Sequence, residues 1–344
     1  MSLMRAARFH QNGPPSVLTV DQIPIPEPGP GQVRVRVRAA ALNHLDLWVR
    51  RGLPIDTTMP HVGGSDLAGE VDVTGPGVEP WTAGQRVVVD PVLNWDWYER
   101  ASTGQDPRER PLQLIGEHTD GGFAEYAVVP AANLMLVPDN LSLEVAAAAA
   151  LNFVTAWHAL TTRGALHAGE RLLVTGGSGG VATAAVQLGA YLGAEVVAVT
   201  SGGRNVERLR ALGAHHAVNR TEGDWVANVR TALGGRGANL VIDSVGEAMW
   251  PGIVRSLAVM GRVVCYGATT GPRSETDLRH LFWKQLTIMG STMGSPAEFR
   301  EVMELVFSGA VAPVIDDVLS LDRIREAHER LEAGDVFGKL VLIP

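Results

Sequence analysis

RLLVTGGSGGVATAAVQLGAYLGAEVVAVT, residues Arg171–Thr200, combines two apolar strand patterns with a glycine-rich turn and an amphipathic helix pattern. The periodicity predicts strands at Leu172–Thr175 and Val196–Thr200 and a helix at Val181–Leu192 between them. A strand, a helix and a second strand in this order form one βαβ unit, which favours a parallel sheet.

The turn inside this unit carries a dinucleotide-binding fingerprint. Gly177, Gly179 and Ala182 fit the pattern G-x-G-x-x-G/A. We expect Gly177 to permit the tight turn, Gly179 to let the backbone approach a pyrophosphate, and Ala182 to let the helix pack closely on the strand. The free N–H groups and the positive dipole end of the helix would then face the phosphates. The strand–turn–helix–strand context favours this interpretation over a simple tight turn.

Composition excludes several classes of protein. The chain has 344 residues, of which 46% are hydrophobic and 19% charged, as in soluble globular proteins with more than one domain. The net charge of −8 argues against a nucleic-acid partner, and no apolar run reaches the ~20 residues of a membrane span. A single cysteine, Cys265, and the lack of a secretion pattern at the N-terminus favour a cytoplasmic protein.

The first part of the chain is rich in predicted strands. Residues 33–38, VRVRVR, alternate apolar and charged side chains, which predicts a strand with one solvated face. Proline and glycine at residues 24–31 and glycine pairs farther along divide the apolar runs into short segments. This pattern predicts a small, bent, barrel-like β domain. A polar excursion at residues 90–122, with Trp95 and Trp97, is expected to form a lobe on that domain.

From Arg171 onward strand and helix patterns alternate, which predicts an α/β doubly wound parallel sheet with ligands at the carboxyl ends of its strands. The predicted boundaries are a β-rich domain at 1–150, a Rossmann nucleotide-binding domain at 151–293 and a return to the first domain at 294–344. After the βαβ unit we expect helices at Asn205–Leu212, Trp225–Leu233 and Trp250–Leu257, and strands at His216–Asn219, Asn239–Asp243, Arg262–Tyr266 and Leu286–Thr292. In the last part, Ser295 and Glu298 form a capping box before a helix that ends at Phe307; a helix at Leu321–Leu331 and a strand at Lys339–Ile343 follow.

The ordered series of motifs resembles the medium-chain dehydrogenase/reductase superfamily over essentially the whole length. The matching segments are residues 41–46 (ALNHLD), residues 116–126 (GEHTDGGFAEY), the glycine turn, residues 263–267 (VVCYG) and residues 337–339 (FGK). The resemblance implies a GroES-like, bent-barrel catalytic domain beside the Rossmann domain. Within the superfamily the chain looks most like the zinc-lacking quinone oxidoreductase and enoyl reductase branch.

Three departures from the zinc alcohol dehydrogenases of that superfamily concern the metal. In those enzymes a cysteine, a Gly-His-Glu segment and a later cysteine or acid hold the catalytic zinc; here the corresponding positions look like Asn43, Gly64-Ser65-Asp66, and Leu151 or Asn152. Such residues do not supply three strong zinc ligands, so no zinc is expected. The lobe at 90–116 has no cysteine for a structural zinc, and packed tryptophans could replace it. A residual metal site remains open; its candidate ligands are His44, Asp46, His61, Asp66 and His118.

The cofactor is expected to be NADPH rather than NADH. NAD-specific sites place an acid about twenty residues after the glycine turn to bind the ribose diol. Here the second strand ends TSGGR, residues 200–204, with no acid, and Arg204 would pair with a 2′-phosphate. A solvated arginine at a helix start remains the alternative for Arg204.

The resemblance implies further contacts with the cofactor. The ends of the strands near Asp243 and Gly267 would line the adenosine and nicotinamide-ribose side, and Ser291–Gly294 would approach the nicotinamide. Lys339 would reach the cofactor, although it could also be an exposed strand lysine, and a loop at Asn152–Thr155 would lie against the nicotinamide. The predicted cofactor-binding set is Gly176, Gly177, Ser178, Gly179, Gly180, Val181, Thr200, Ser201, Arg204, Asn219, Asp243, Ser244, Val245, Gly267, Ala268, Ser291, Met293 and Lys339.

The chemistry expected is hydride transfer from NADPH to a quinone or an α,β-unsaturated carbonyl as small-molecule substrate. Simple alcohol oxidation benefits from a metal that lowers the pKa of the alcohol, whereas these electron-poor acceptors need less help. The predicted catalytic positions are Asn43, Asp46 and Thr155. The Asn43 amide could donate a hydrogen bond to the substrate oxygen, and the Thr155 hydroxyl could bond the carboxamide group of the nicotinamide. For Asp46 a purely structural role is the alternative. A zinc-type alcohol dehydrogenase or aldehyde reductase and a non-enzymatic, crystallin-like NADPH-binding protein are the alternatives. The resemblance also implies a homodimer through the edge strand Leu286–Thr292.

Overall fold

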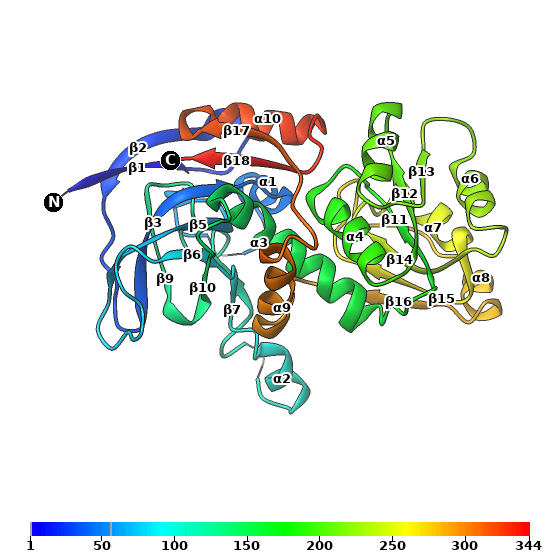
Figure 1. Ribbon diagram of the computed structural model, residues 1–344, viewed down its shortest axis with the longest axis horizontal. Coiled ribbons are helices and arrows are strands. Elements are labelled where there is room, and N and C mark those ends of the chain that lie inside the picture. Colours follow the sequence, from blue (N-terminus) through cyan, green and yellow to red (C-terminus); the bar gives the residue numbers. More distant parts are fainter. Residues whose placement is uncertain (1, 56, 107) are drawn as a thin grey trace. The chain divides into compact units, whose positions relative to one another are not determined.

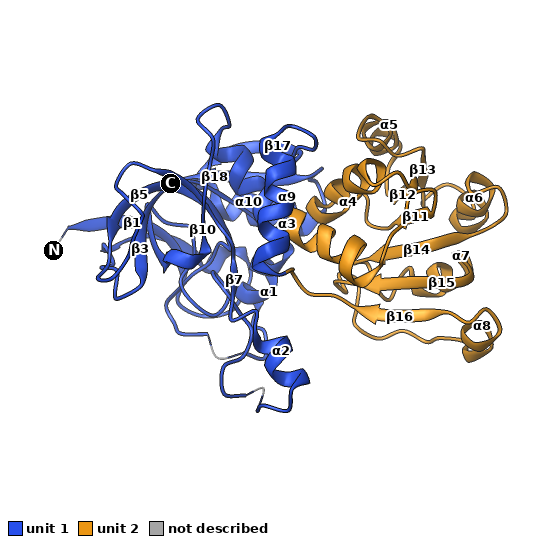
Figure 2. Cartoon of the chain, turned by 60° about the horizontal axis from the view of Figure 1, so that its bottom comes forward, with its two compact units in different colours: residues 1–151, 295–344 blue, residues 152–294 orange. Residues whose placement is uncertain are grey.

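The computed structural model describes residues 2–55, 57–106 and 108–344, and the chain divides into two compact units. Unit 1 consists of Met1–Leu151 and Ser295–Pro344, and unit 2 of Asn152–Gly294 (Figure 2). Unit 2 is therefore continuous in sequence and interrupts unit 1.

Unit 2 is built on a sheet of six parallel strands in the order β13-β12-β11-β14-β15-β16 (Figure 1). This is the 3-2-1-4-5-6 order of a dinucleotide-binding doubly wound sheet, as the strand–helix alternation predicted. The strands are β11 Arg171–Val174, β12 Glu195–Thr200, β13 His216–Asn219, β14 Ala238–Asp243, β15 Leu257–Cys265 and β16 Thr287–Gly290.

Helices connect these strands, as parallel neighbours require. They are α4 Gly180–Tyr191, α5 Gly203–Ala211, α6 Trp225–Ala232, α7 Trp250–Ser256 and α8 Leu278–Trp283. The central strands are apolar on both faces, and Leu173, Val197 and Val263 are fully buried. The sequence pattern did not predict α8, whose Leu278, Phe282 and Trp283 side chains are exposed and give no buried stripe.

Helix α3, Leu143–His158, continues as a π-helical turn at Ala159–Arg163. The prediction of a loop at Asn152–Thr155 was wrong, because these residues lie inside α3. Phe153 and Val154 are fully buried there, so tertiary packing outweighs the low helix propensity of such side chains. The helix is long and apolar enough to cross a membrane by composition, but 83% of its apolar window is buried inside the protein, as in a core helix.

The β-rich unit 1 contains a seven-stranded sheet with the path β10-β6-β5-β3-β18-β17, in which β9 also pairs with β3. A three-stranded sheet, β2-β1-β4, and a two-stranded sheet, β7-β8, complete it. The strands are β1 Leu3–Phe9, β2 Leu18–Pro24, β3 Gln32–Ala41, β4 His61–Val62, β5 Asp66–Thr74, β6 Arg86–Val89, β7 Val92–Leu93, β8 Gln113–Leu114, β9 Tyr126–Pro130, β10 Leu134–Leu136, β17 Ile315–Ser320 and β18 Lys339–Ile343.

Strand β3 shows why the alternating segment forms the centre of this sheet. Val33, Val35 and Val37 are buried in the core, whereas Arg34 and Arg38 on the other face form ion pairs with Asp72 and Glu70 of β5. The arginines therefore belong to a structural strand face.

Besides the first part of α3, four α-helices and three short 3-10 helices accompany the strands of unit 1 in the described residues. Ser295 caps α9 as predicted: Glu298 N–H donates to Ser295 Oγ at 3.2 Å, and Ser295 N–H donates to Glu298 Oε2 at 2.7 Å. The helices are α1 His44–Arg51, α2 Trp97–Ser102, α9 Pro296–Phe307, α10 Ile324–Ala333 and the 3-10 segments Pro15–Val17, Ala131–Asn133 and Leu321–Arg323.

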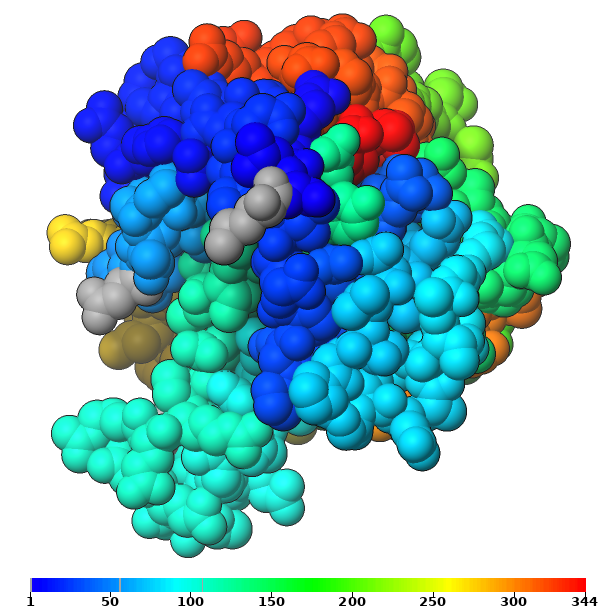
Figure 3. Space-filling view, turned by 90° about the vertical axis from the view of Figure 1, so that its left-hand side faces the viewer, coloured from blue at the N-terminus to red at the C-terminus, as the bar shows by residue number. Residues whose placement is uncertain are grey.

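The lobe predicted between Asp90 and Gly116 contains β7, α2 and β8. Its aromatic side chains pack on one another: the Tyr98 ring lies 5.0 Å from the Trp95 ring and 4.8 Å from the Trp97 ring. Figure 3 shows this part of the chain, in blue-green, standing out from the rest of unit 1.

Candidate functional site

The glycine turn of unit 2 follows β11 and has two crowded positions. Gly176 has a φ of +61°, a left-handed conformation that glycine adopts without strain. A Cβ on Gly177 would lie 2.9 Å from Leu209 Cδ1 and 3.0 Å from the Val199 carbonyl oxygen. The sequence assigned the tight turn to Gly177; in the structure Gly176 has the left-handed backbone, and Gly177 permits close packing against β12 and α5.

The N-terminus of α4 is open to an anion. Its N-cap is Gly179, which makes no side-chain capping bond, and a Cβ there would meet only the Gly176 carbonyl oxygen, at 3.5 Å. The first-turn N–H groups at Gly180 and Val181 are thus not capped by a side chain of the described residues, and Ser178 belongs to the turn before them. Ala182 is buried, which brings the helix close to the sheet. This arrangement fits a pyrophosphate.

The ends of β12 and β13 lie side by side, because Thr200 pairs with Asn219. Gly202 N–H donates to Asn219 Oδ1 at 3.1 Å, which fixes the turn before α5. Ser201 and Arg204 are exposed at the start of α5, whose N-cap has no side-chain bond. This edge therefore presents a helix N-terminus and an exposed arginine side chain, and the sequence has no acid of the NAD-specific type after β12.

The ends of β14 and β15 form the other side of the turn. Asp243 is fully buried; it accepts bonds from Thr175 Oγ1 and from the N–H groups of Val245 and Gly246, and burial raises its pKa. Ser244 Oγ and Val245 Cγ2 lie within 3.5 Å of the place where a Cβ on Gly176 would be. The Asp243 carboxylate is thus occupied by structural bonds.

Further predicted positions gather on this side of unit 2. A Cβ on Gly267 would lie 3.1 Å from Ser244 Cβ, and Ala268 follows Gly267 in the chain. The strand ends around the glycine turn therefore bring together predicted residues from three separate βα connections.

Three buried polar atoms in unit 2 have no hydrogen-bond partner among the described residues: Thr200 Oγ1, Ser291 Oγ and Asn152 Oδ1. Buried polar atoms without partners are rare in folded proteins, and a bound polar ligand would satisfy them. All three follow or lie in segments that the sequence assigned to the cofactor. Together with the open turn, they make unit 2 a fit for a nicotinamide dinucleotide.

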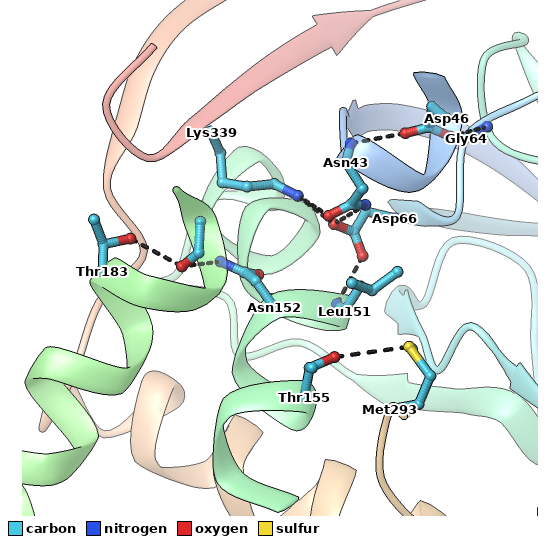
Figure 4. Close-up of polar contacts among 11 residues, drawn as sticks. Asn43, Asp46, Gly64, Asp66, Leu151, Asn152, Thr155, Thr183, Met293 and Lys339 are labelled. Atoms are coloured by element: carbon cyan, nitrogen blue, oxygen red, sulfur yellow. Dashed lines mark hydrogen bonds and ion pairs between the residues drawn. The ribbon is translucent and has the colours of Figure 1, made fainter. Parts of the chain in front are cut away.

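Thr155 lies in α3, where its hydroxyl is 3.7 Å from the sulfur of Met293. Met293 is buried and has a φ of +52°, so the backbone turns sharply just before Gly294. Asn152, one turn before Thr155, donates from Nδ2 to the Gly180 carbonyl oxygen at 3.3 Å (Figure 4). This bond ties α3 to the first residue of α4.

In unit 1 the predicted catalytic residue Asn43 is the N-cap of α1. Asp46 accepts bonds from the Asn43 N–H at 2.7 Å and from the Gly64 N–H at 3.1 Å. Burial raises the pKa of Asp46 to about 7, although these bonds and the charge of Lys339 act in the opposite direction. Asp46 therefore holds the backbone on both sides of the Asn43 side chain.

Lys339 and Asp66 meet beside Asn43 (Figure 4). The Lys339 ammonium donates to Asn43 Oδ1 at 2.5 Å and to Asp66 Oδ2 at 2.8 Å, and Asn43 Nδ2 donates to Asp66 Oδ2 at 2.9 Å. The other Asp66 oxygen accepts the Leu151 N–H at 2.7 Å. Strand pairing explains the meeting, because Ala41 at the end of β3 lies opposite Asp66 of β5 on one side and Val341 of β18 on the other.

These residues do not fit a zinc ion. Asn43 Oδ1 and both Asp66 oxygens are already bonded, and a divalent cation beside the Lys339 ammonium would be repelled. Ser65, at the position of the histidine in the resembling zinc enzymes, is a weak ligand. Within residues 2–55, 57–106 and 108–344, no three His, Cys, Asp or Glu side chains are grouped closely enough to hold a metal.

The histidines considered as residual ligands have other surroundings. His61 is buried with Nε2 3.0 Å from the Gly116 carbonyl oxygen, and its ring packs on Phe9. His118 Nδ1 accepts the Leu114 N–H at 3.2 Å, and His44 is exposed at the start of α1. These bonds are structural.

Sequence reasoning did not identify the partners of Lys339. It expected this side chain to reach the cofactor, and that contact stays a prediction; in the structure the ammonium is bound by Asn43 and Asp66. It also gave Asp66 no role except as a residual metal ligand. The sequence did contain a signal for a role of Asp66, because this charged residue begins an otherwise apolar strand segment, Asp-Leu-Ala-Gly.

Two family models match the chain. The zinc-binding dehydrogenase model covers residues 180–308, and the alcohol dehydrogenase GroES-like domain model covers residues 29–139. A solved structure described as an NAD-dependent alcohol dehydrogenase is 42% identical, has a TM-score of 0.93 and covers 99% of this chain and 100% of its own. An NAD-dependent alcohol dehydrogenase of Sulfolobus acidocaldarius is 31% identical over 98% of this chain and 99% of its own length.

Reductases of other substrates match over similar lengths. A crotonyl-CoA reductase of Streptomyces avermitilis is 30% identical over 96% of this chain and 83% of its own length. A quinone oxidoreductase of Homo sapiens is 26% identical over 99% of this chain and 98% of its own. The chain therefore belongs to the medium-chain dehydrogenase/reductase family, as an NAD(P)H-dependent oxidoreductase with a GroES-like domain and a Rossmann domain.

Proposed function

We propose that this oxidoreductase uses NADPH, without a metal, to reduce a quinone or an α,β-unsaturated carbonyl compound. The observation that carries the proposal is the Asn43–Asp66–Lys339 cluster, which provides hydrogen-bond donors and one ammonium where a catalytic metal would need ligands. Electron-poor acceptors do not require the strong Lewis acid that alcohol oxidation benefits from. The names of two relatives, a crotonyl-CoA reductase and a quinone oxidoreductase, agree with this choice.

The residues around the glycine turn would hold the cofactor. The uncapped α4 N-terminus would bind the pyrophosphate, and Thr200, Ser291 and Asn152 would give their unpartnered oxygens to polar groups of the dinucleotide. When bound, NADPH supplies a hydride to the acceptor carbon. The protein then has to orient the acceptor and stabilise the negative charge that develops on its oxygen.

The preference for NADPH rests on Arg204. Its guanidinium stands at the uncapped start of α5 beside the end of β12, where a 2′-phosphate of the adenosine ribose would lie. Arg204→Gln should raise KM for NADPH at least about tenfold and change KM for NADH little, since a charge-assisted bond contributes about 1.5–3 kcal/mol. The control is Arg210→Gln on the same helix, whose guanidinium pairs with Glu207. An Arg204→Gln variant with unchanged kinetics for NADPH would contradict the preference.

The reaction itself is tested with a panel of quinones, enones, unsaturated thioesters and aldehydes, each with NADPH and with NADH. We expect turnover of quinones or enones with NADPH, insensitive to chelators. A second candidate is NAD-linked alcohol oxidation, which the 42% identical alcohol dehydrogenase structure favours. Alcohol oxidation with one bound zinc per chain, abolished by a chelator, would establish that candidate. Cofactor binding without any turnover would instead favour a non-enzymatic, crystallin-like role.

We also propose a homodimer through the edge of the unit 2 sheet. Strand β16 is the terminal strand of that sheet (Figure 2), and α8 precedes it in the chain. The exposed apolar side chains on these elements and on β15 are Val259, Met260, Leu278, Phe282, Trp283 and Ile288. An exposed apolar sheet edge of this kind favours pairing with a second copy.

A further inference from the structure

Lys339 carries an ammonium group that is buried in unit 1. Its side chain is 3% exposed, and two of its three N–H groups are used, toward Asn43 Oδ1 and Asp66 Oδ2. The third N–H has no partner among the residues that the structure describes. A buried cation is costly unless paired, so the remaining N–H has strong potential to bind an oxygen atom that enters the site. The sequence contains only one other lysine, Lys284.

The Asn43 amide is fixed in one orientation by the same cluster. Its oxygen accepts from the Lys339 ammonium, and its nitrogen donates to the Asp66 carboxylate. If the amide were turned over, the NH2 group would face the ammonium and the oxygen would face the carboxylate, which replaces two attractions by two repulsions. One amide N–H of Asn43 is left without a partner in the described part of the chain.

Asp66 organises both donors. It is fully buried at the first position of β5, and one of its oxygens accepts from Lys339 and Asn43 while the other accepts from the Leu151 backbone. A carboxylate held in this way cannot rotate without losing at least one charge-assisted bond. The ammonium and the amide therefore have fixed positions before any substrate arrives, which is the preorganisation that stabilises a developing charge.

We propose that the Lys339 ammonium is the electrophile of the reaction, that Asn43 donates beside it, and that Asp66 is the positioning residue for both. This inference rests on the proposed function. Reduction brings two electrons and one hydrogen, as hydride, to the acceptor carbon and leaves the electron pair of the carbonyl or quinone on its oxygen. The ammonium pairs with that oxyanion, and a proton from water then neutralises it. Lys339 thus supplies with a fixed charge what related enzymes could obtain from a metal.

The alternative role for Lys339 is binding of a cofactor phosphate, and the test separates the two. Lys339→Met alone would leave Asp66 buried without its cation, so the main variant is Lys339→Met combined with Asp66→Asn, which keeps the cluster neutral. Lys284→Met is the matched control, because it changes the other lysine, whose ammonium binds the Leu257 and Arg255 carbonyl oxygens. Thermal unfolding confirms that each variant is folded, fluorescence titration gives Kd for NADPH, and kinetics give kcat and KM.

We expect the double variant to bind NADPH within about threefold of the wild type and to lose at least about 100-fold in kcat. In Lys339→Ala, added methylamine should restore part of kcat, because it returns an ammonium group to the place beside Asp66. Lys284→Met should match the wild type.

Three results would overturn the inference while leaving an oxidoreductase in place. A weakened Kd for NADPH with unchanged kcat would assign Lys339 to the cofactor. Unchanged Kd and kcat would remove Lys339 from the reaction. One tightly bound zinc per wild-type chain, with activity lost on chelation, would make the metal the electrophile. If the wild type reduces no acceptor of the panel, the proposed function and the inference fall together.

Discussion

His328 should make unit 1 sensitive to acid. The side chain lies in α10, is 2% exposed, and neither ring nitrogen has a hydrogen-bond partner among the described residues. The Phe123 ring packs edge-on against it at 6.2 Å. Burial lowers the pKa of His328 from 6.5 to about 3, and the positive charge of Arg50 makes a smaller contribution in the same direction. Folding therefore excludes a proton that the unfolded chain would bind.

The sign and size of the effect follow from linkage. Between pH 6.5 and about 3, His328 binds a proton in the unfolded state but not in the folded state. The free energy of unfolding therefore falls as the pH is lowered through this range, and the contribution of the neutral His328 is complete above pH 6.5. At pH 5 the loss attributable to His328 is about 2 kcal/mol relative to pH 8. For a unit of this size that corresponds to about 4–8 °C in Tm.

The assay compares the wild type with His328→Leu by calorimetry at pH 8 and pH 5. Leucine cannot take up a proton, and other titrating groups cancel in the difference, so the variant should gain about 2 kcal/mol over the wild type as the pH falls. His216→Leu, at an exposed position of β13 in unit 2, is the control for replacing a histidine by leucine outside unit 1. A His328→Leu advantage that is the same at both pH values would refute the reasoning.

Two further predictions concern unit 2. Gly177→Ala should lower both Tm and the affinity for NADPH, because the added Cβ would lie 2.9 Å from Leu209 Cδ1. The control is Gly203→Ala, which should leave Tm unchanged because a Cβ at Gly203 would have no heavy atom within 4 Å. Differential scanning fluorimetry and fluorescence titration measure the two effects, and an unaffected Gly177→Ala would contradict the close packing. Trp283→Glu, at an 82% exposed position, should convert the proposed dimer to monomers in light scattering, while a wild type that is already monomeric at all concentrations would refute the dimer.

Local patterns were enough to predict most of unit 2. Strand β13, His216–Asn219, has the bounds that the sequence suggested, and the central βαβ unit differs by one residue or so at each end. The strands of a buried parallel sheet are short apolar runs bounded by glycine or polar residues, and that signal is local. The fold class and the family were accordingly predictable before the structure.

Elements with a weak local signal were missed or misassigned. Strand β17 contains Asp316 and Asp317 and has no apolar alternation, so only its pairing with β18 makes it a strand. Residues 152–155 were assigned to a loop, but the burial of Phe153 and Val154 holds them in α3. In both cases contacts with distant residues outweigh local preference.

The candidate site was predictable residue by residue but not as an arrangement. Asn43, Asp46 and Lys339 were singled out, and their roles stay predictions. Their mutual contacts depend on β18 pairing with β3, across about 300 positions of sequence, which no local pattern indicates. The fixed orientation of the Asn43 amide could be inferred only when Asp66 and Lys339 were placed beside it.

The interruption of unit 1 by unit 2 also imposes an order on folding. Unit 2 is continuous, so every contact in its sheet can form within one stretch of 143 residues, Asn152–Gly294. The Lys339–Asn43 contact instead spans a sequence separation of 296 residues, and closing so long a loop is slow while the intervening chain is unfolded. A folded unit 2 shortens that loop in effect, because it replaces flexible chain by a compact body. We therefore expect unit 2 to form first and the Asn43–Asp66–Lys339 cluster of unit 1 to be completed last.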